Sequence, residues 1–188
     1  MFGIGQTDLL LDVGRQDRLV VINVPADLPT APVPLVVVYH GYGGTAADAA
    51  KQTGLSAKGE AEGFRFVAVY PQGIDNEWHI AGYPSTAAFG DGDLQLFLAV
   101  LDRVAESGCI DMTHVYVTGH SQGGGMASLL ACTFADRVAA VAPVAGESLE
   151  LPCKPSRPIP IVAFHSREDP TLLYEGGHIP HTSSSFPD

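Results

Sequence analysis

Short runs of β-branched and aromatic residues alternate along this chain with segments of helical character. Six runs have the length, the valine and isoleucine content and the flanking glycine or proline residues of β-strands: DRLVVINV, PLVVVYH, FRFVAVYP, HVYVTG, RVAAVAPV and PIPIVAFH. Several of them are apolar at consecutive positions, so both faces of the strand would be buried. This pattern is typical of parallel strands covered by helices on both sides, and not of an antiparallel sheet with one face in water.

Three segments between these runs carry helical signals. From Leu94 onward, leucine, phenylalanine and valine recur at intervals of three and four residues after Asp91 and Asp93, which is the pattern of an amphipathic helix with acidic residues at its N-terminus. A second helix is expected to start just after Ser121, and a third, interrupted by glycine, within residues 45–63. Strands and helices in repeated alternation predict an α/β fold with a mostly parallel, doubly wound sheet and helices on both faces.

Length and charge limit the classes of protein to consider. A chain of 188 residues can bury a sizeable core, and we expect residues 1–188 to form a single domain. Its 21 acidic and 10 basic residues give a net charge of −11, which repels nucleic-acid phosphates and anionic lipids. The longest apolar stretches fall well short of the roughly 20 residues that cross a bilayer. We therefore expect no nucleic-acid partner and no membrane insertion, and the N-terminus shows no secretory signal pattern.

The three cysteines, Cys109, Cys132 and Cys153, are irregularly spaced and lack the CxxC pairs of a structural zinc site. One disulfide with one free thiol and three free thiols are both compatible with this pattern. No nucleotide-binding glycine motif, phosphate loop or HExxH spacing occurs in the sequence. We therefore expect neither a cofactor nor a metal.

The sequence GHSQG, residues 119–123, places Ser121 between two glycines where an expected strand meets an expected helix. Small flanking residues permit the strained strand–turn–helix bend that presents a serine hydroxyl at a helix N-terminus. The alternative is a serine that serves only as a helix N-cap. We interpret Ser121 as a nucleophile that would form an acyl-enzyme.

Such a nucleophile needs preorganised N–H donors that stabilise the oxyanion of its transition state. The backbone N–H of Gln122, directly after the serine, is one candidate. The glycine-rich sequence HGYGG, residues 40–44, follows the run PLVVVY and offers the N–H of Tyr42 as the second. The alternative reading of this stretch is a tight turn that uses glycine only for its backbone freedom.

A base, and a carboxylate that orients it, would complete the site. Asp169 lies just after the run PIPIVAFH, although an acidic residue before proline is also an ordinary turn former. The candidates for the base are His178 and, as the alternative, His181, both in the sequence GGHIPH. His120, next to the serine, is expected at the substrate pocket.

Five stretches carry a resemblance to a known family: PLVVVYHGYGGTA, VAVYPQG before Trp78, DGDLQLFLAVLDRVAESGCIDMTHVYVTGHSQGGGMA, VAAVAPVAG and AFHSREDPTLLYEGG. In these stretches the chain resembles the polyhydroxybutyrate depolymerase and feruloyl esterase family of α/β-hydrolases, which includes LpqC-like esterases. The resemblance implies a cofactor-independent serine esterase, secreted or in the cell envelope, that acts on a small or polymeric ester. It also implies that Ser121 is the nucleophile, Asp169 the triad acid, Tyr42 and Gln122 the oxyanion donors, and Trp78 a residue near the substrate pocket.

The chain departs from the family pattern at its C-terminus. The family places its catalytic histidine in a GGHTWP-like motif after a further strand, whereas this chain stops at Asp188, 19 residues after Asp169. We therefore expect an α/β-hydrolase domain without the last strand and helix, and a tail over residues 178–188. The sheet edge left exposed would favour a homo-oligomer that covers it. The alternative to an active esterase is a non-catalytic or truncated hydrolase-fold domain that lacks a working base.

Overall fold

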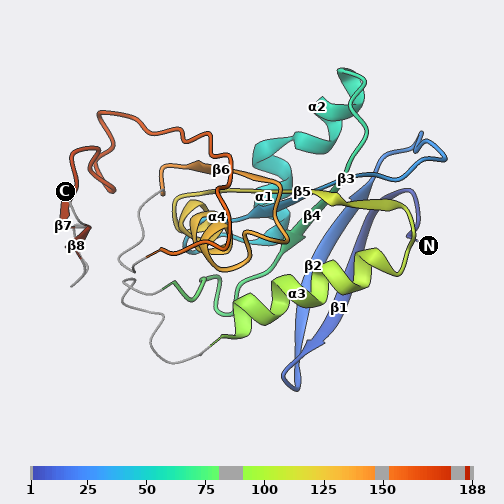
Figure 1. Cartoon of the computed structure of the whole chain (residues 1–188), viewed down its shortest axis with the longest axis horizontal. Coiled ribbons are helices and arrows are strands. Elements are labelled where there is room, and N and C mark those ends of the chain that lie inside the picture. The colour runs from blue at the N-terminus through green and yellow to red at the C-terminus, as the bar shows by residue number, and fades with distance from the viewer. Residues whose placement is uncertain (1, 81–90, 147–152, 179–184, 187–188) are drawn as a thin grey trace.

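The main sheet of the protein is mixed and carries helices on both sides (Figure 1). The structure, a computed structural model, describes residues 2–80, 91–146, 153–178 and 185–186. In the order in which they pair, the strands are β1 (Gly5–Val13), β2 (Gln16–Val24), β4 (Val67–Pro71), β3 (Val33–Tyr39), β5 (Ile110–His120) and β6 (Ala140–Val144). The helices are α1 (Ala46–Thr53), α2 (Leu55–Ala61), α3 (Gly92–Ala105) and α4 (Gln122–Thr133).

The predicted parallel arrangement is confirmed for β4, β3, β5 and β6. The other edge of the sheet is antiparallel, because β2 pairs in that sense with both β1 and β4. The sequence indicated β2 but not β1. Most of the side chains of β1 are exposed or only half-buried, since it pairs on one side only, so it lacks the apolar run of a buried strand.

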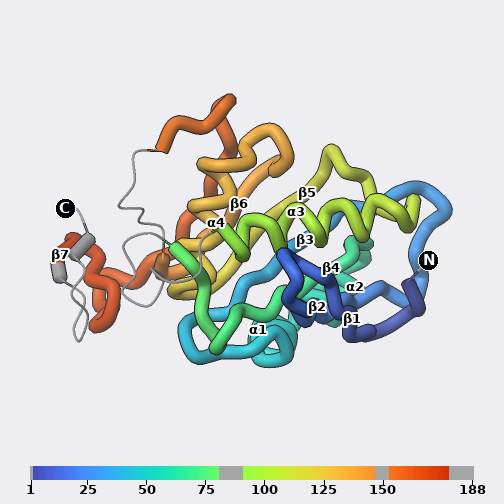
Figure 2. Tube along the Cα trace, turned by 90° about the horizontal axis from the view of Figure 1, so that it is seen from below, coloured from blue at the N-terminus to red at the C-terminus, as the bar shows by residue number. Residues whose placement is uncertain are grey.

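Alternate residues of the central strands point to opposite faces of the sheet, and each face has its own apolar layer. Val37 belongs to the cluster that contains residues of α3 and α4, whereas its neighbour Val38 packs with Ala46 and Ala49 of α1. Figure 2 shows α1 and α3 on opposite sides of the strands. Each fully buried valine contributes about 1.5–3 kcal/mol to the free energy of folding. Because both faces of β3 are buried, valine is favourable at consecutive positions in this strand.

The expected helices are all present. The glycine-interrupted segment forms two helices, α1 and α2, because Gly54 adopts a left-handed conformation (φ 55°) between them. Thr45 and Asp48 form a capping box at the start of α1. No helix within the described ranges is both long and apolar enough to span a membrane.

The run PIPIVAFH differs from its prediction as a full strand. It runs parallel to β6 but makes only two isolated bridges, from Ile161 to Val141 and from Phe164 to Val144. Ile161, Val162 and Phe164 are each more than half exposed, so an apolar sheet edge is present. The strands β7 (Gly177–His178) and β8 (Ser185–Phe186) do not cover it, because they pair with each other as a separate sheet. Oligomerisation through this edge stays a prediction.

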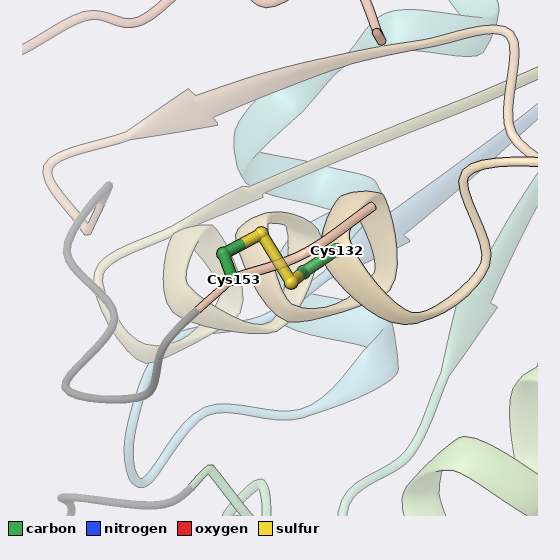
Figure 3. The surroundings of a disulfide bond; sticks show 2 residues. All are labelled: Cys132 and Cys153. Atoms are coloured by element: carbon green, nitrogen blue, oxygen red, sulfur yellow. A yellow bond between two sulfur atoms is a disulfide. The ribbon is translucent and has the colours of Figure 1, made fainter. Parts of the chain in front are cut away.

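A disulfide joins Cys132, near the end of α4, to Cys153 (Figure 3). Cys109 is a free thiol. Of the two cysteine arrangements compatible with the sequence, the structure therefore has one disulfide and one free thiol. The bond anchors the segment that leads to the β6 edge onto the helix that follows Ser121.

Replacing Cys153 by serine should lower the free energy of unfolding by about 2–3 kcal/mol, because the disulfide closes a loop of moderate length in the unfolded chain. Urea unfolding followed by circular dichroism measures this change. The matched control is Cys109→Ser, which removes a free thiol and should shift the midpoint little. Equal midpoints for the two variants would contradict the assigned pairing.

Candidate active site

Ser121 forms the bend between β5 and α4. Its backbone angles, φ 55° and ψ −121°, lie in a region that residues with a side chain rarely adopt. Its N–H donates to the carbonyl of Val144 in β6 at 2.8 Å, and its carbonyl accepts from Gly124 and Gly125. The side chain does not cap α4, and no described residue forms a hydrogen bond with its hydroxyl. The arrangement is therefore the strained elbow rather than an ordinary N-cap.

The glycines around Ser121 are required by close backbone approach. A Cβ on Gly123 would overlap the carbonyl oxygen of Tyr39, and a Cβ on Gly119 would overlap that of Gly123. Gly146, after β6, meets the carbonyl of Ser121 in the same way. The elbow thus sits closer to the ends of β3 and β6 than side chains at these positions would allow.

The glycine turn of residues 40–44 lies against this elbow. A Cβ built on Gly41 would be 3.5 Å from the Cβ of Ser121. Within the turn, the N–H of Gly43 donates to the carbonyl of Asn76 at 2.9 Å. The N–H groups of Tyr42 and Gln122 have no partner among the described residues. The two predicted oxyanion donors are therefore unpaired and belong to the two segments that meet at the serine.

The side chain of His40 connects the glycine turn to the loop that follows β4. Its Nδ1 lies 2.8 Å from the carbonyl oxygen of Gly41, and its Nε2 lies 3.0 Å from the backbone nitrogen of Gly73. Because a carbonyl only accepts and an N–H only donates, the ring is neutral and carries its proton on Nδ1. Burial lowers the pKa of His40, against the opposing effects of the Gly41 hydrogen bond and nearby carboxylates. His40 is thus a structural group rather than a base.

Trp78, predicted near the substrate pocket, contacts both the glycine turn and the elbow, and its relation to a substrate stays a prediction. Its side chain is completely buried and stacks edge-on against Tyr39, with ring centroids 4.8 Å apart. Its indole N–H donates to the carbonyl of His40 at 2.8 Å. Its backbone N–H donates to Oε1 of Gln122 at 3.0 Å, and its carbonyl accepts from Nε2 of Gln122 at 3.1 Å. Trp78 therefore connects the glycine turn to the elbow, a role that its sequence position did not reveal.

Asp169 follows the segment that lies beside β6. Its Oδ1 accepts from the N–H groups of Thr171 at 2.8 Å and Leu172 at 2.9 Å, and its Oδ2 lies 3.5 Å from Nε2 of His165. Burial raises the pKa of Asp169, but the two amide donors, His165 and His120 outweigh it, so the pKa lies below its usual value. The segment before Asp169 bridges to Val144 at the end of β6, and the carbonyl of Val144 accepts from the N–H of Ser121, so this carboxylate lies at the same end of the sheet as the elbow.

The histidines predicted for the site occupy different places. His120 is exposed, and together with Gly41 it lines a cavity of about 320 Å³ between α1 and the ends of β3 and β5. His178 lies in β7, whose backbone pairs with Ser185 apart from the main sheet (Figure 1). His181 lies outside the described residues. The identity of the base thus stays a prediction. In the described part of the chain, no group of three or more metal-ligating side chains gathers at one point.

The site as a whole lies at the carboxyl ends of β3, β5 and β6, where ligands bind in open α/β sheets. It combines a hydroxyl without a hydrogen-bond partner among the described residues, two unpaired backbone N–H donors and a carboxylate. This set is suited to attack on a carbonyl carbon, with the carbonyl oxygen received by the two N–H groups.

The matching family model and two curated relatives connect the chain with known proteins. The model of the esterase PHB depolymerase family matches residues 20–177. Feruloyl esterase B of Piromyces equi is 28% identical over 168 residues, which are 85% of this chain and 31% of that protein. Poly(3-hydroxyalkanoate) depolymerase C of Paucimonas lemoignei is 36% identical over 128 residues, which are 66% of this chain and 30% of that protein. The chain thus spans less than a third of the length of these two relatives.

Among solved structures, a thermostable esterase superimposes with a TM-score of 0.72 at 21% identity, over 90% of this chain and 48% of that chain. This likeness confirms the α/β-hydrolase fold. The family match over residues 20–177 includes the glycine turn, the elbow and Asp169. On this basis the chain belongs to the esterase PHB depolymerase family.

Proposed function

We propose that the protein is a serine carboxylic-ester hydrolase that works through an acyl-enzyme on Ser121. One observation carries the proposal: the strained bend at Ser121 lies against a glycine turn, and each of these two segments has a backbone N–H without a partner among the described residues. Backbone strain of this kind persists where the surrounding structure enforces it, and it clusters at active sites.

In the proposed reaction, Oγ of Ser121 attacks the ester carbonyl carbon while a base removes the hydroxyl proton. The carbonyl oxygen becomes an oxyanion that accepts from the N–H groups of Tyr42 and Gln122. The carbon–oxygen bond to the alcohol then breaks, and the base returns its proton to the departing alcohol. Water repeats the sequence on the acyl-enzyme and releases the acid. Both donors are expected to be important for the rate, because losing one oxyanion donor typically lowers kcat by about 10²–10³-fold.

Asp169 is proposed as the carboxylate that orients the base. Its lowered pKa supports this role, because the group is ionised at neutral pH and can accept from a histidine N–H. His178 is proposed as the base, with His181 as the alternative. His120 is proposed to contact substrate, since it is exposed and lines the cavity beside the glycine turn.

The substrate class proposed is an ester with a short acyl chain. Relatives named feruloyl esterase and poly(3-hydroxyalkanoate) depolymerase support ester chemistry of this type. The sequence shows no large apolar insertion that would serve as a lid over a long chain.

A second candidate is a non-catalytic hydrolase-fold domain that keeps the elbow without a working base. One observation favours it: no described residue forms a hydrogen bond with the hydroxyl of Ser121. The two candidates differ in whether this serine is chemically activated.

Replacing Ser121 by alanine should abolish hydrolysis of p-nitrophenyl acetate, with a loss of at least about 10³-fold, because the nucleophile is removed. It should also abolish stoichiometric labelling by a fluorophosphonate probe. The matched control is Ser128→Ala, a change of the same size within α4 that should keep both. Equal labelling of the wild type and Ser121→Ala would contradict the assignment, and a folded but unlabelled wild type would favour the non-catalytic candidate.

Changing His178 to glutamine should lower kcat by roughly 10³-fold, as expected when a general base is lost from a triad. The same change at His181 should leave kcat nearly unaltered, and at His120 it should raise KM more than it lowers kcat. Steady-state kinetics on the three variants measures these effects. If His181→Gln loses activity while His178→Gln keeps it, the base is His181 instead.

Stability should decrease as the pH falls below about 6.5, because the turn that supplies Tyr42 depends on a neutral His40. The folded-state pKa of His40 is lowered, so the unfolded chain, with a pKa of about 6.5, takes up the proton first. Stabilisation is therefore complete above pH 6.5 and is lost towards the folded-state pKa. Urea unfolding at pH 7.5 and 5.5 should show a smaller difference for His40→Gln than for the wild type. An unchanged difference would contradict this.

A further inference from the structure

Three buried polar side chains form a network behind the site. Asp93, at the start of α3, is 1% exposed, and Arg18 of β2 is 4% exposed. Oδ1 of Asp93 lies 2.6 Å from Nη2 of Arg18. Its Oδ2 accepts from both the backbone N–H and the Nδ1–H of His79, at 2.7 and 2.5 Å. Each oxygen of the Asp93 carboxylate therefore accepts from at least one protein donor.

Such a network is not explained by stability alone. A buried ion pair contributes little relative to apolar residues of the same volume, because desolvation offsets the attraction of the charges. Once formed, however, it fixes the geometry of the groups that it joins, since an unpaired charge in the interior is costly. The pair of Arg18 and Asp93 can therefore hold in place the segment to which both side chains bind.

That segment is the loop of residues 72–80, which the network binds at both ends. At one end, Nη2 of Arg18 donates to the carbonyl of Gln72 at 3.0 Å. At the other end, Asp93 binds the backbone and ring of His79. The two ends of the loop are therefore tied to one buried carboxylate and its guanidinium partner.

Between its ends, the loop touches both halves of the proposed oxyanion hole. On the glycine turn, Gly73 donates to the ring of His40, and Asn76 accepts from the N–H of Gly43. At the elbow, Trp78 makes its two backbone hydrogen bonds with the side chain of Gln122. A shift of the loop would therefore change the separation of the two donors that face the serine.

We propose that Arg18, Asp93 and His79 are positioning residues, which set the oxyanion hole by holding loop 72–80 between the glycine turn and the elbow. This inference rests on the proposed esterase function. These side chains bind Gln72 and one another, so the network acts on the site through the backbone that it fixes. Its effect should appear in the transition state, where the oxyanion forms, and not in substrate binding.

The kinetic test compares two substitutions of one residue. His79→Leu removes the Nδ1–H donor, whereas His79→Asn keeps a side-chain N–H that can reach Asp93. For p-nitrophenyl acetate, we expect His79→Leu and Asp93→Asn to lower kcat by roughly 10–100-fold with little change in KM, and His79→Asn to recover most of the loss. The control is His114→Leu, which removes the exposed pair of His114 with Asp111 at the amino end of β5 and should leave kcat unchanged.

A second measurement does not need turnover. Amide hydrogen exchange at Gly43 and Gly44 should speed up in His79→Leu, while the amides of α3 keep their wild-type protection. If the wild type hydrolyses no ester, the proposed function fails, and this selective exchange still tests the positioning. The inference is overturned if His79→Leu keeps wild-type kcat, if His79→Asn loses as much as His79→Leu, or if exchange rises equally in both regions.

Discussion

The positive φ of Ser121 is the constraint on which the rest of the site depends. A residue with a side chain holds this conformation at a cost of about 1–3 kcal/mol, so the neighbouring backbone has to enforce it. Here the enforcement comes from β6, whose Val144 carbonyl accepts from the N–H of Ser121, and from Gly123, which lies against the end of β3. The bend therefore exists only when the three parallel strands are assembled.

The same close approach brings the two donor segments together. Gly123 has no side chain to hold α4 away from the end of β3, and Gly41 in the following turn consequently lies next to Ser121. The indole of Trp78 then binds the carbonyl of His40, and the side chain of Gln122 binds the backbone of Trp78. The two N–H groups that we propose as oxyanion donors are consequently held in place by the fold itself, which is the condition for electrostatic preorganisation.

Local patterns were sufficient to predict the parallel strands, the helices and the elbow. Consecutive valines in β3 require two covered faces, and glycines on both sides of Ser121 permit the bend, so both features depend on near neighbours in sequence. The run PIPIVAFH shows the limit of such patterns. Its composition fits a strand, and backbone hydrogen bonds join it to β6 on one side. Among the described residues, however, it forms only two isolated bridges, and no strand pairs with its other edge.

The sequence by itself predicted the bend at Ser121, the glycine turn that precedes α1 and the carboxylate that follows β6, because small residues and breakers mark those turns. Only the tertiary structure decided that Trp78 is a buried connector and that Arg18 and Asp93, 75 residues apart, form one ion pair. It also decided that Cys132 pairs with Cys153. The reason is physical: hydrogen bonds, ion pairs and disulfides between distant residues depend on how the strands and helices pack, and a local pattern of residue types does not encode that geometry.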